Sequence, residues 1–343
     1  MRRRAIAYAL LSAVLFGAST PLAKIFVGSM SPLALAGLLY LGSGIGLGAW
    51  LLLRRRVMTV AGRDVPWLAG AIVAGGIVGP ALLMYGLART DAASASLLLN
   101  LEAVFTAVMA WVVFRENVDR RVFAGMAAIV AGGVLLAWQQ APDVRSTMGP
   151  LLIAGACLAW ALDNNLTRRV SGGDAVALAA LKGLVAGAAN LGLALALGAR
   201  LPAPGALAAA ALVGLVGYGM SLVLFIMALR DLGTARTSAY FSIAPFFGAA
   251  LALLVLGEQP APAFWVAAVL MATGVWLHVT ERHEHDHVHE PMAHTHEHVH
   301  DSHHRHGHEP GWDGHEPHTH RHEHGRLRHR HPHYPDLHHR HGH

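Results

Sequence analysis

The chain contains few of the residues on which soluble enzymes depend. Charged residues make up 14% of its 343 residues, and Cys157 is its one cysteine. A single cysteine excludes an intrachain disulfide and a thiolate metal cluster, so we expect Cys157 to be a small core residue. The sequence also lacks a Walker motif and a nucleotide-binding domain. Any process that the protein drives must therefore use an ion gradient or the gradient of its own substrate, and no catalytic constellation predicts an enzyme.

Apolar residues take the place of the missing charges. Hydrophobic residues make up 54% of the chain, and its mean hydropathy is +0.42, which is more apolar surface than a soluble protein of this length can bury. A helix needs roughly 20 mostly apolar residues to cross the hydrocarbon of a bilayer. Breaks at charged and Pro/Gly clusters predict ten such spans, at 5–26, 31–53, 66–88, 92–114, 121–138, 148–166, 174–198, 206–229, 236–256 and 260–280.

The apolar body is an internal duplication. The stretch SASLLLNLEAVFTAVMAWVVFRE, at 94–116, returns as SAYFSIAPFFGAALALLVLGE at 238–258. With Glu116 set against Glu258, an offset of 142 residues, Ser96 falls on Ser238. A looser match links FGASTPLAK from Phe16 with WALDNNLTR. Because such self-similarity decides the fold, the chain is predicted to be two related halves of five spans each.

The basic residues predict how these spans are oriented. If the N-terminus is cytoplasmic, fourteen arginines lie in cytoplasmic segments and four basic residues lie on the opposite side. This bias follows the positive-inside rule and, with ten spans, places both termini in the cytoplasm of a cell whose inner or plasma membrane holds the protein. Since five is an odd number, the second half enters the membrane inverted. Many secondary transporters use such inverted repeats to alternate access to a site between the halves.

Two five-span halves, each with an apolar segment, a Glu and a last span, and APFFGAALALLVLGE from Ala244 in the second copy, resemble the EamA-type permeases of the drug/metabolite transporter (DMT) superfamily. The resemblance covers about 1–280. It implies an all-α integral membrane protein of about ten transmembrane helices in two inverted five-helix repeats, 1–140 and 148–280, with a disordered tail at 281–343. It also implies a secondary active transporter, an exporter of a small solute or metabolite, with no required cofactor. Pro245 in the second copy replaces Ala103, so the halves need not bend alike.

Polar residues inside the predicted spans are the candidates for substrate binding or ion coupling, because a charge at a helix centre costs about 2.5–3.5 kcal/mol on insertion scales. Glu102 is expected near the middle of the fourth span, and a proton that it binds and releases is the simplest coupling ion. Lys182, in the seventh span, is its expected partner. The candidate substrate and coupling residues are Glu102, Asn100, Lys182, Asp163 and Asn164.

A structural interpretation of the same residues stays open. In it, Glu102 and Lys182 form an ion pair that holds the bundle together, and Asp163 is an interfacial residue neutralised by Arg168. Tyrosines are further candidates for the substrate path, although aromatic residues in membrane proteins more often belong to the core or the interface. They are Tyr85, Tyr218 and Tyr240.

The tail differs completely from the apolar body. From His283 to His343 it has 24 histidines in 61 residues, whereas none precedes His278. Such a segment cannot build a core, and we expect it to be disordered when nothing is bound. Histidines two residues apart in an extended chain point the same way, and neutral imidazole suits Zn, Ni, Co and Cu ions. The expected ligands are His283, His285, His287, His289, His294, His296, His298, His300, His303 and His304.

Three functions follow as alternatives. The first is a carrier of a small organic solute with a metal-binding tail. The second is a divalent transition-metal carrier (Ni, Co or Zn) whose tail delivers or senses its cargo, and the third is a membrane-tethered metal-binding protein. The expected partners are the lipid bilayer, a small-molecule substrate and transition-metal ions, with no nucleic acid, and a homodimer stays open.

Overall fold

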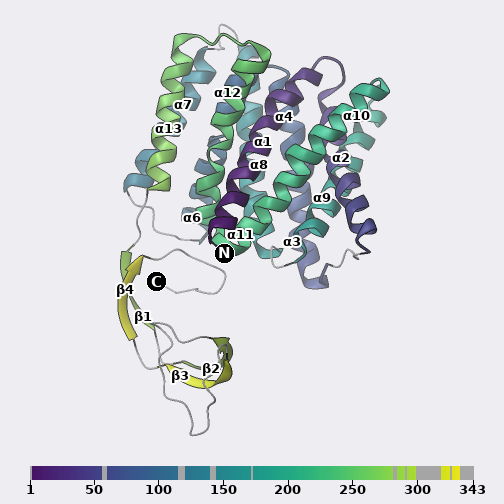
Figure 1. Cartoon of the computed structure of the whole chain (residues 1–343). Helices are drawn as coiled ribbons and strands as arrows, with labels where there is room; N and C mark the ends of the chain where they lie inside the picture. Colours follow the sequence, from purple (N-terminus) through teal and green to yellow (C-terminus); the bar gives the residue numbers. More distant parts are fainter. Residues whose placement is uncertain are drawn as a thin grey trace. The chain divides into compact units, whose positions relative to one another are not determined.

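The computed structural model describes residues 2–55, 60–114, 120–139, 144–170 and 173–280, and, in the tail, 284–289, 292–298, 318–324 and 327–332. A helical body that extends to Glu281 forms one compact unit, and residues Arg282–Tyr334 form another (Figure 1).

The first half of the body has seven α-helices and two short segments of other helix types among its described residues. They are α1 (Arg2–Phe26), α2 (Pro32–Leu53), the 3-10 helix η1 (Gly62–Asp64), α3 (Val65–Ala71), the π-helix η2 (Ile72–Val78), α4 (Gly79–Leu87), α5 (Ala92–Leu98), α6 (Leu101–Phe114) and α7 (Arg120–Gln139). The Ser31 side chain caps the start of α2, where Pro32 supplies a fixed φ at a position that needs no donor.

The second half repeats this order. Its helices are α8 (Val144–Val170), α9 (Ala175–Ala196), α10 (Pro204–Val213), the π-helix η3 (Gly214–Met220), α11 (Ser221–Phe241), α12 (Ala244–Leu256) and α13 (Pro262–Val279). Asp174 caps α9, the counterpart of α2, by accepting from the N–H groups of Val176 and Ala177. The predicted boundary between the eighth and ninth spans, 229–236, lies inside α11, which continues through it.

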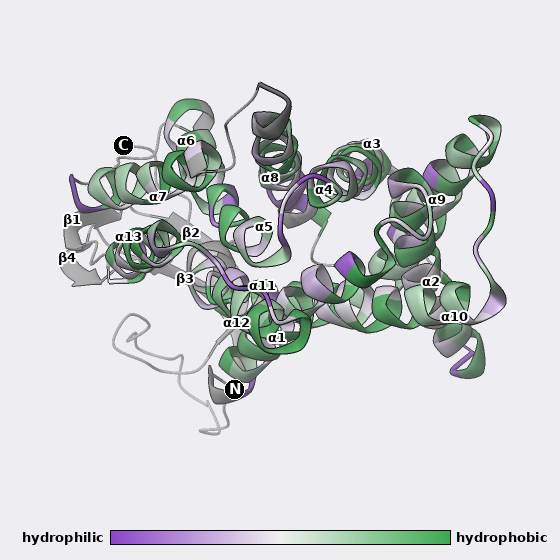
Figure 2. Ribbon diagram, turned by 90° about the horizontal axis from the view of Figure 1, so that it is seen from above, coloured by the Kyte–Doolittle hydropathy of each residue, from purple (hydrophilic) through white to green (hydrophobic). Residues whose placement is uncertain are grey.

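Nine stretches of the described residues are long and apolar enough to cross a membrane. They account for every predicted span except 148–166, which lies within α8. Helix α8 has 27 residues, more than a span requires, but its apolar run gives way to Asp163, Asn164 and Asn165. It packs against α4 and α6 inside the bundle (Figure 2). The body is thus an all-α membrane fold of two inverted five-helix repeats.

Both halves depart from regular α-helix at matching places. The offset of 142 residues carries the π-helix Ile72–Val78 onto the π-helix Gly214–Met220. The fourth span of each half is also interrupted, between α5 and α6 at 99–100 and between α11 and α12 at 242–243. The breaks therefore correspond although Pro245 has no counterpart in the first half. Proline is not what determines their position.

Small residues let neighbouring helices approach closely. Helices α2 and α9 pack along one another at one end of the body, and α7 and α13 do so at the other (Figure 2). A Cβ at Gly44 of α2 would overlap the backbone of Gly183 and Leu184 in α9, and a Cβ at Gly187 would overlap the backbone of Leu41. Because lipid tails are as apolar as leucine, such close backbone packing is a main source of attraction between membrane helices.

The described tail residues form two antiparallel ladders. Strand β1 (Glu284–His289) pairs with β4 (Leu327–Pro332), and β2 (Met292–His298) pairs with β3 (His318–His324). Isolated two-stranded ladders are marginally stable in water. The ladders are therefore compatible with a tail that lacks a packed core of its own.

Candidate substrate cavity

Helices of both halves enclose a cavity. The space that a water-sized molecule can occupy in it has a volume of about 70 Å³, enough for a few water molecules. Its walls come from α1, α2 and α6 of the first half and from α8, α9, η3 and α11 of the second. The lining residues are Phe16, Tyr40, Ser43, Glu102, Trp160, Asp163, Asn164, Ala179, Lys182, Gly183, Tyr218, Ser221, Leu222, Phe225 and Phe241.

A buried ion pair lies on one wall of the cavity. The Lys182 Nζ atom lies 2.5 Å from each carboxylate oxygen of Asp163, and Thr167 Oγ1 donates to Asp163 Oδ1 at 2.9 Å. Asp163 and Lys182 are 6% and 4% exposed. The expectation that Asp163 is interfacial is therefore wrong, because α8 carries it into the bundle. The side chain of its other expected partner, Arg168, lies outside the described residues.

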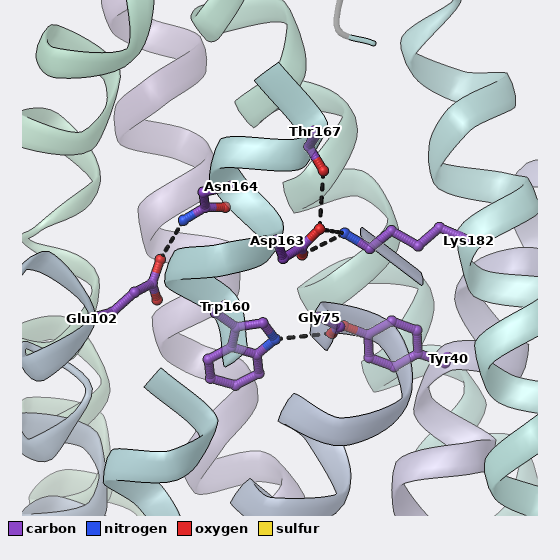
Figure 3. Close-up of polar contacts among 8 residues, drawn as sticks. All are labelled: Tyr40, Gly75, Glu102, Trp160, Asp163, Asn164, Thr167 and Lys182. Carbon is purple, nitrogen blue, oxygen red and sulfur yellow. Dashed lines mark hydrogen bonds and ion pairs between the residues drawn. The ribbon is translucent and has the colours of Figure 1, made fainter. Parts of the chain in front are cut away.

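Glu102 has a different partner from the one that the sequence suggested. Its Oε1 atom accepts a hydrogen bond of 2.6 Å from Asn164 Nδ2, and among the described residues it has no ion-pair partner. The expected Glu102–Lys182 pair is thus wrong. Successive residues of a helix point about 100° apart, so Asp163 faces Lys182 on α9 while Asn164 faces Glu102 on α6 (Figure 3). Glu102 also occupies the first turn of α6, where the helix dipole favours a negative charge.

Asn100 is the one predicted site residue that does not line the cavity. It lies in the break between α5 and α6, and its Nδ2 atom is 2.9 Å from the Leu97 carbonyl oxygen and 3.9 Å from Met271 Sδ on α13. The other four predicted residues, Glu102, Lys182, Asp163 and Asn164, line the cavity together.

Two cavity residues that sequence reasoning missed hold the π-helix of the first half. Tyr40 Oη donates to the Gly75 carbonyl oxygen at 2.8 Å, and Trp160 Nε1 donates to the same oxygen at 3.0 Å (Figure 3). Asn190 Nδ2 lies 3.2 Å from the Gly76 oxygen. A π-helix alters the carbonyl directions within an α-helix and is frequent at functional sites. The sequence signal for Trp160 was its place opposite Phe16 in the repeat alignment.

An aromatic wall completes the cavity, and the sequence pattern did not reveal it. The Phe16 ring lies 5.6 Å from Trp160, 5.8 Å from Tyr218 and 5.4 Å from Phe241. Tyr40 stacks near Tyr218 at 5.4 Å. Such edge and tilted contacts are favourable for aromatic pairs.

The three candidate tyrosines have different positions. Tyr218 lines the cavity, whereas Tyr85 and Tyr240 do not. Tyr85 instead packs under the Arg89 guanidinium, 6.0 Å from its ring centre.

A clasp at the C-terminal end of α1 lies outside the cavity. Lys24 Nζ donates to the carbonyl oxygens of Leu87 and Thr90, at 2.6 and 2.7 Å. The Glu258 carboxylate accepts from the N–H groups of Ala92 and Ala93, both at 2.8 Å. The turn between α4 and α5 is thereby tied to α1 and to the loop after α12. The repeat alignment had marked Glu258 without indicating this role.

Predicted metal ligands are described in part. His285, His287 and His289 lie in β1, and His294, His296 and His298 lie in β2, whereas His283, His300, His303 and His304 lie outside the described residues. The register sets His294 opposite His322 and His296 opposite His320. Among residues that the structure describes, no three His, Cys, Asp or Glu side chains are grouped closely enough to hold a metal ion.

Comparison with known proteins agrees with this architecture. The EamA-like transporter family matches residues 3–138 and again residues 147–280. The chain therefore belongs to the EamA-like transporter family, and it is a multi-pass membrane transporter.

Two individual proteins are also similar to the chain. An uncharacterized transporter of Methanothermobacter thermautotrophicus is 28% identical over 283 residues, which cover 77% of this chain and 82% of the relative. A crystal structure of a protein that is 20% identical superimposes with a TM-score of 0.62, covering 82% of this chain and 98% of the other. At that identity the likeness concerns the fold alone.

Proposed function

We propose that the protein is a secondary active exporter that carries a small organic solute through the cavity by alternating access. The single observation that carries the proposal is the composition of the cavity walls, which come from both halves of the inverted repeat. A site between two inverted halves can open to either side of the membrane when the halves rock against each other. The aromatic wall favours an organic solute over a metal ion as the cargo.

We further propose that Glu102 binds and releases the coupling proton. Its carboxylate lines the cavity, and its described hydrogen-bond partner is the neutral amide of Asn164. A proton can therefore bind without breaking an ion pair. Asp163, by contrast, is engaged by Lys182 on both oxygens.

An unbiased transport assay tests both statements. Proteoliposomes that contain the full chain are loaded with a mixture of small metabolites, a pH gradient is imposed, and the contents are followed by mass spectrometry. We expect at least one solute to leave faster than from protein-free liposomes, and Glu102→Gln to lower that rate by at least about tenfold, which corresponds to about 1.4 kcal/mol. Asp231→Asn, which removes one exposed carboxylate outside the cavity, is the matched control and should leave the rate unchanged.

Two outcomes contradict these proposals. If no solute moves under any gradient, the carrier function is refuted. If Glu102→Gln transports with an unchanged dependence on pH, Glu102 is structural and the proton binds elsewhere.

The orientation and the direction of transport belong to the same proposal. The distribution of arginines supports cytoplasmic termini in the cell membrane. Reporter fusions after Arg56 and at the C-terminus should both be active in the cytoplasm. A reporter at the C-terminus that is active on the other side would refute this topology.

The second candidate function rests on the tail, and we propose that it binds several Zn, Ni, Co or Cu ions. The pKa of an unperturbed imidazole is about 6.5. Most tail histidines are therefore neutral and able to bind metal at pH 7.5, whereas near pH 5 most are protonated and repel the metal. Because ligands must be deprotonated, calorimetry should show metal binding at pH 7.5 that collapses near pH 5.

A truncated chain distinguishes a metal-binding appendage from a metal carrier. A chain that ends at Glu281 should still insert, purify and carry the organic solute. If full-length protein carries metal ions into liposomes and the truncated chain does not, the protein is a metal carrier instead. If a peptide of residues 283–343 binds none of the four metals at pH 7.5, the tail proposal is refuted.

A further inference from the structure

We infer that the substrate of the cavity is a small organic cation, a substituted ammonium ion, and this inference rests on the proposed carrier function. It goes beyond that function because it names the charge and the chemical class of the solute.

The charges on the cavity wall favour a cation. Three charged residues line the cavity within the described part of the chain: Glu102, Asp163 and Lys182. Asp163 and Lys182 neutralise each other at 2.5 Å, and Thr167 adds a further hydrogen bond to Asp163. The remaining charge is that of Glu102, whose described partner is the amide of Asn164. A cationic ligand would supply the counter-charge that the protein does not place beside this carboxylate.

The aromatic rings favour an organic cation over a hydrated inorganic one. Ring faces carry negative potential and attract ammonium groups, most strongly where water is excluded. The six aromatic residues lining the cavity in the described structure are Phe16, Tyr40, Trp160, Tyr218, Phe225 and Phe241. They form one connected group, because Phe16 contacts Trp160, Tyr218 and Phe241, and Phe225 lies 5.0 Å from Phe241. Such a group offers apolar contact to the carbon atoms of the ligand and electrostatic attraction to its charge.

An anionic solute fits the same wall poorly. Lys182 is the cation among the described lining residues, and both of its short contacts go to Asp163. An anion that approached Lys182 would have to displace a buried carboxylate, and removing one partner of a buried ion pair leaves the other uncompensated. It would also face Glu102 across a small cavity. Selection between cation and anion is therefore built into the lining.

Three probes of nearly equal shape test the inference. Choline carries a quaternary ammonium, 3,3-dimethylbutan-1-ol replaces its nitrogen by carbon, and 3,3-dimethylbutanoate has the same bulky group with a negative charge. Binding to purified full-length protein is measured by calorimetry, and counter-flow in proteoliposomes is measured for each probe. Benzyltrimethylammonium serves as a second cation. We expect both cations to bind at least about tenfold more tightly than the neutral isostere, and the anion to bind most weakly.

Variants separate the carboxylate from the rings. Glu102→Gln should remove most of the preference for choline over the neutral isostere. Phe225→Leu should weaken binding of the cations by a few-fold and leave the neutral isostere almost unchanged. Phe123→Leu on α7, whose side chain is 60% exposed on the outer surface, is the matched aromatic control and should change neither. Thermal unfolding of each variant checks that it is folded.

The outcomes distinguish this inference from the proposed function. If the neutral or anionic probe binds as tightly as the cations, or if neither cation binds, the inference is refuted. If metabolites are still carried in the unbiased assay, the carrier function survives that refutation. If the preference for cations is present but persists in Glu102→Gln, Glu102 is not the recognition group and the inference fails in this form.

Discussion

The two π-helices occupy equivalent positions in the two halves but are held in different ways. In η2, the Gly75 carbonyl oxygen accepts hydrogen bonds from Tyr40 and Trp160. In η3, glycines allow close packing instead: a Cβ at Gly217 would come within 2.5 Å of Ser19 Cβ, and one at Gly219 within 2.8 Å of Ser43 Oγ. The backbone deviation is thus shared by both repeats, whereas the side chains that support it are not.

The same contrast extends to the charged residues. By the repeat offset, Glu102 corresponds to Ala244, and Lys182 corresponds to Tyr40. The acidic and basic groups of the cavity therefore have apolar or neutral counterparts. A duplicated scaffold can keep its symmetry in the backbone while its chemistry becomes asymmetric, and substitutions at corresponding positions test how far that separation goes.

The largest effect is expected from Lys182→Met. This change leaves Asp163 buried without its cation, and breaking a buried pair in this way typically costs about 3–5 kcal/mol. The free energy of unfolding, measured by denaturation of the purified protein in detergent, should fall accordingly. The double variant Asp163→Leu with Lys182→Met should recover most of the loss. A double variant as unstable as the single one would show that the pair is not the cause.

A smaller effect is expected from Gly75→Ala. Its Cβ would overlap the Asp163 carboxylate, and overpacking of this kind usually costs about 1–3 kcal/mol. Gly217→Ala, at the corresponding position, should cost a similar amount because it meets Ser19. Gly205→Ala is the control, since a Cβ there would meet nothing within 4 Å. Equal melting temperatures for all three variants would refute the packing argument.

The smallest effect is expected from Tyr40→Phe. The change removes the hydroxyl that donates to Gly75 but keeps the ring, and the loss of one such hydrogen bond costs about 0.5–1.5 kcal/mol. Because Trp160 still donates to the same oxygen, the lower part of this range is expected. Tyr8→Phe on the outer part of α1 serves as a control for the loss of a tyrosine hydroxyl. A larger loss than for Gly75→Ala would mean that the hydrogen bond, and not the packing, holds the π-helix.

Much of the fold could be predicted from the sequence because hydrophobic length and self-similarity are local properties of the chain. Nine predicted spans recur as apolar stretches, and the tenth lies within α8. The π-helices and the matching breaks could not be predicted, since they depend on contacts such as that of Tyr40 with Gly75, 35 residues apart. The break near Asn100 carries no proline to indicate it.

The candidate site was predicted in its residue types but not in its pairing. Polar residues inside apolar spans are conspicuous, so Glu102, Asp163, Asn164 and Lys182 could all be identified. Which of them pair depends on the rotation of α8 about its axis, and a difference of one residue exchanges Asp163 for Asn164. The aromatic wall escaped prediction for another reason, because a phenylalanine in a membrane span has the same sequence signal whether it faces lipid or a cavity.

The crossing of α2 and α9 has a consequence for how such a chain can arise. The contact of Gly44 with Leu184 becomes the contact of Gly187 with Leu41 when the halves are exchanged. Contacts related in this way are isologous, like those at the two-fold axis of a dimer. A five-helix chain with a glycine at this position could pack against an inverted copy of itself, so that one residue would supply both contacts. The fused chain holds the two glycines separately, and each is free to change without the other.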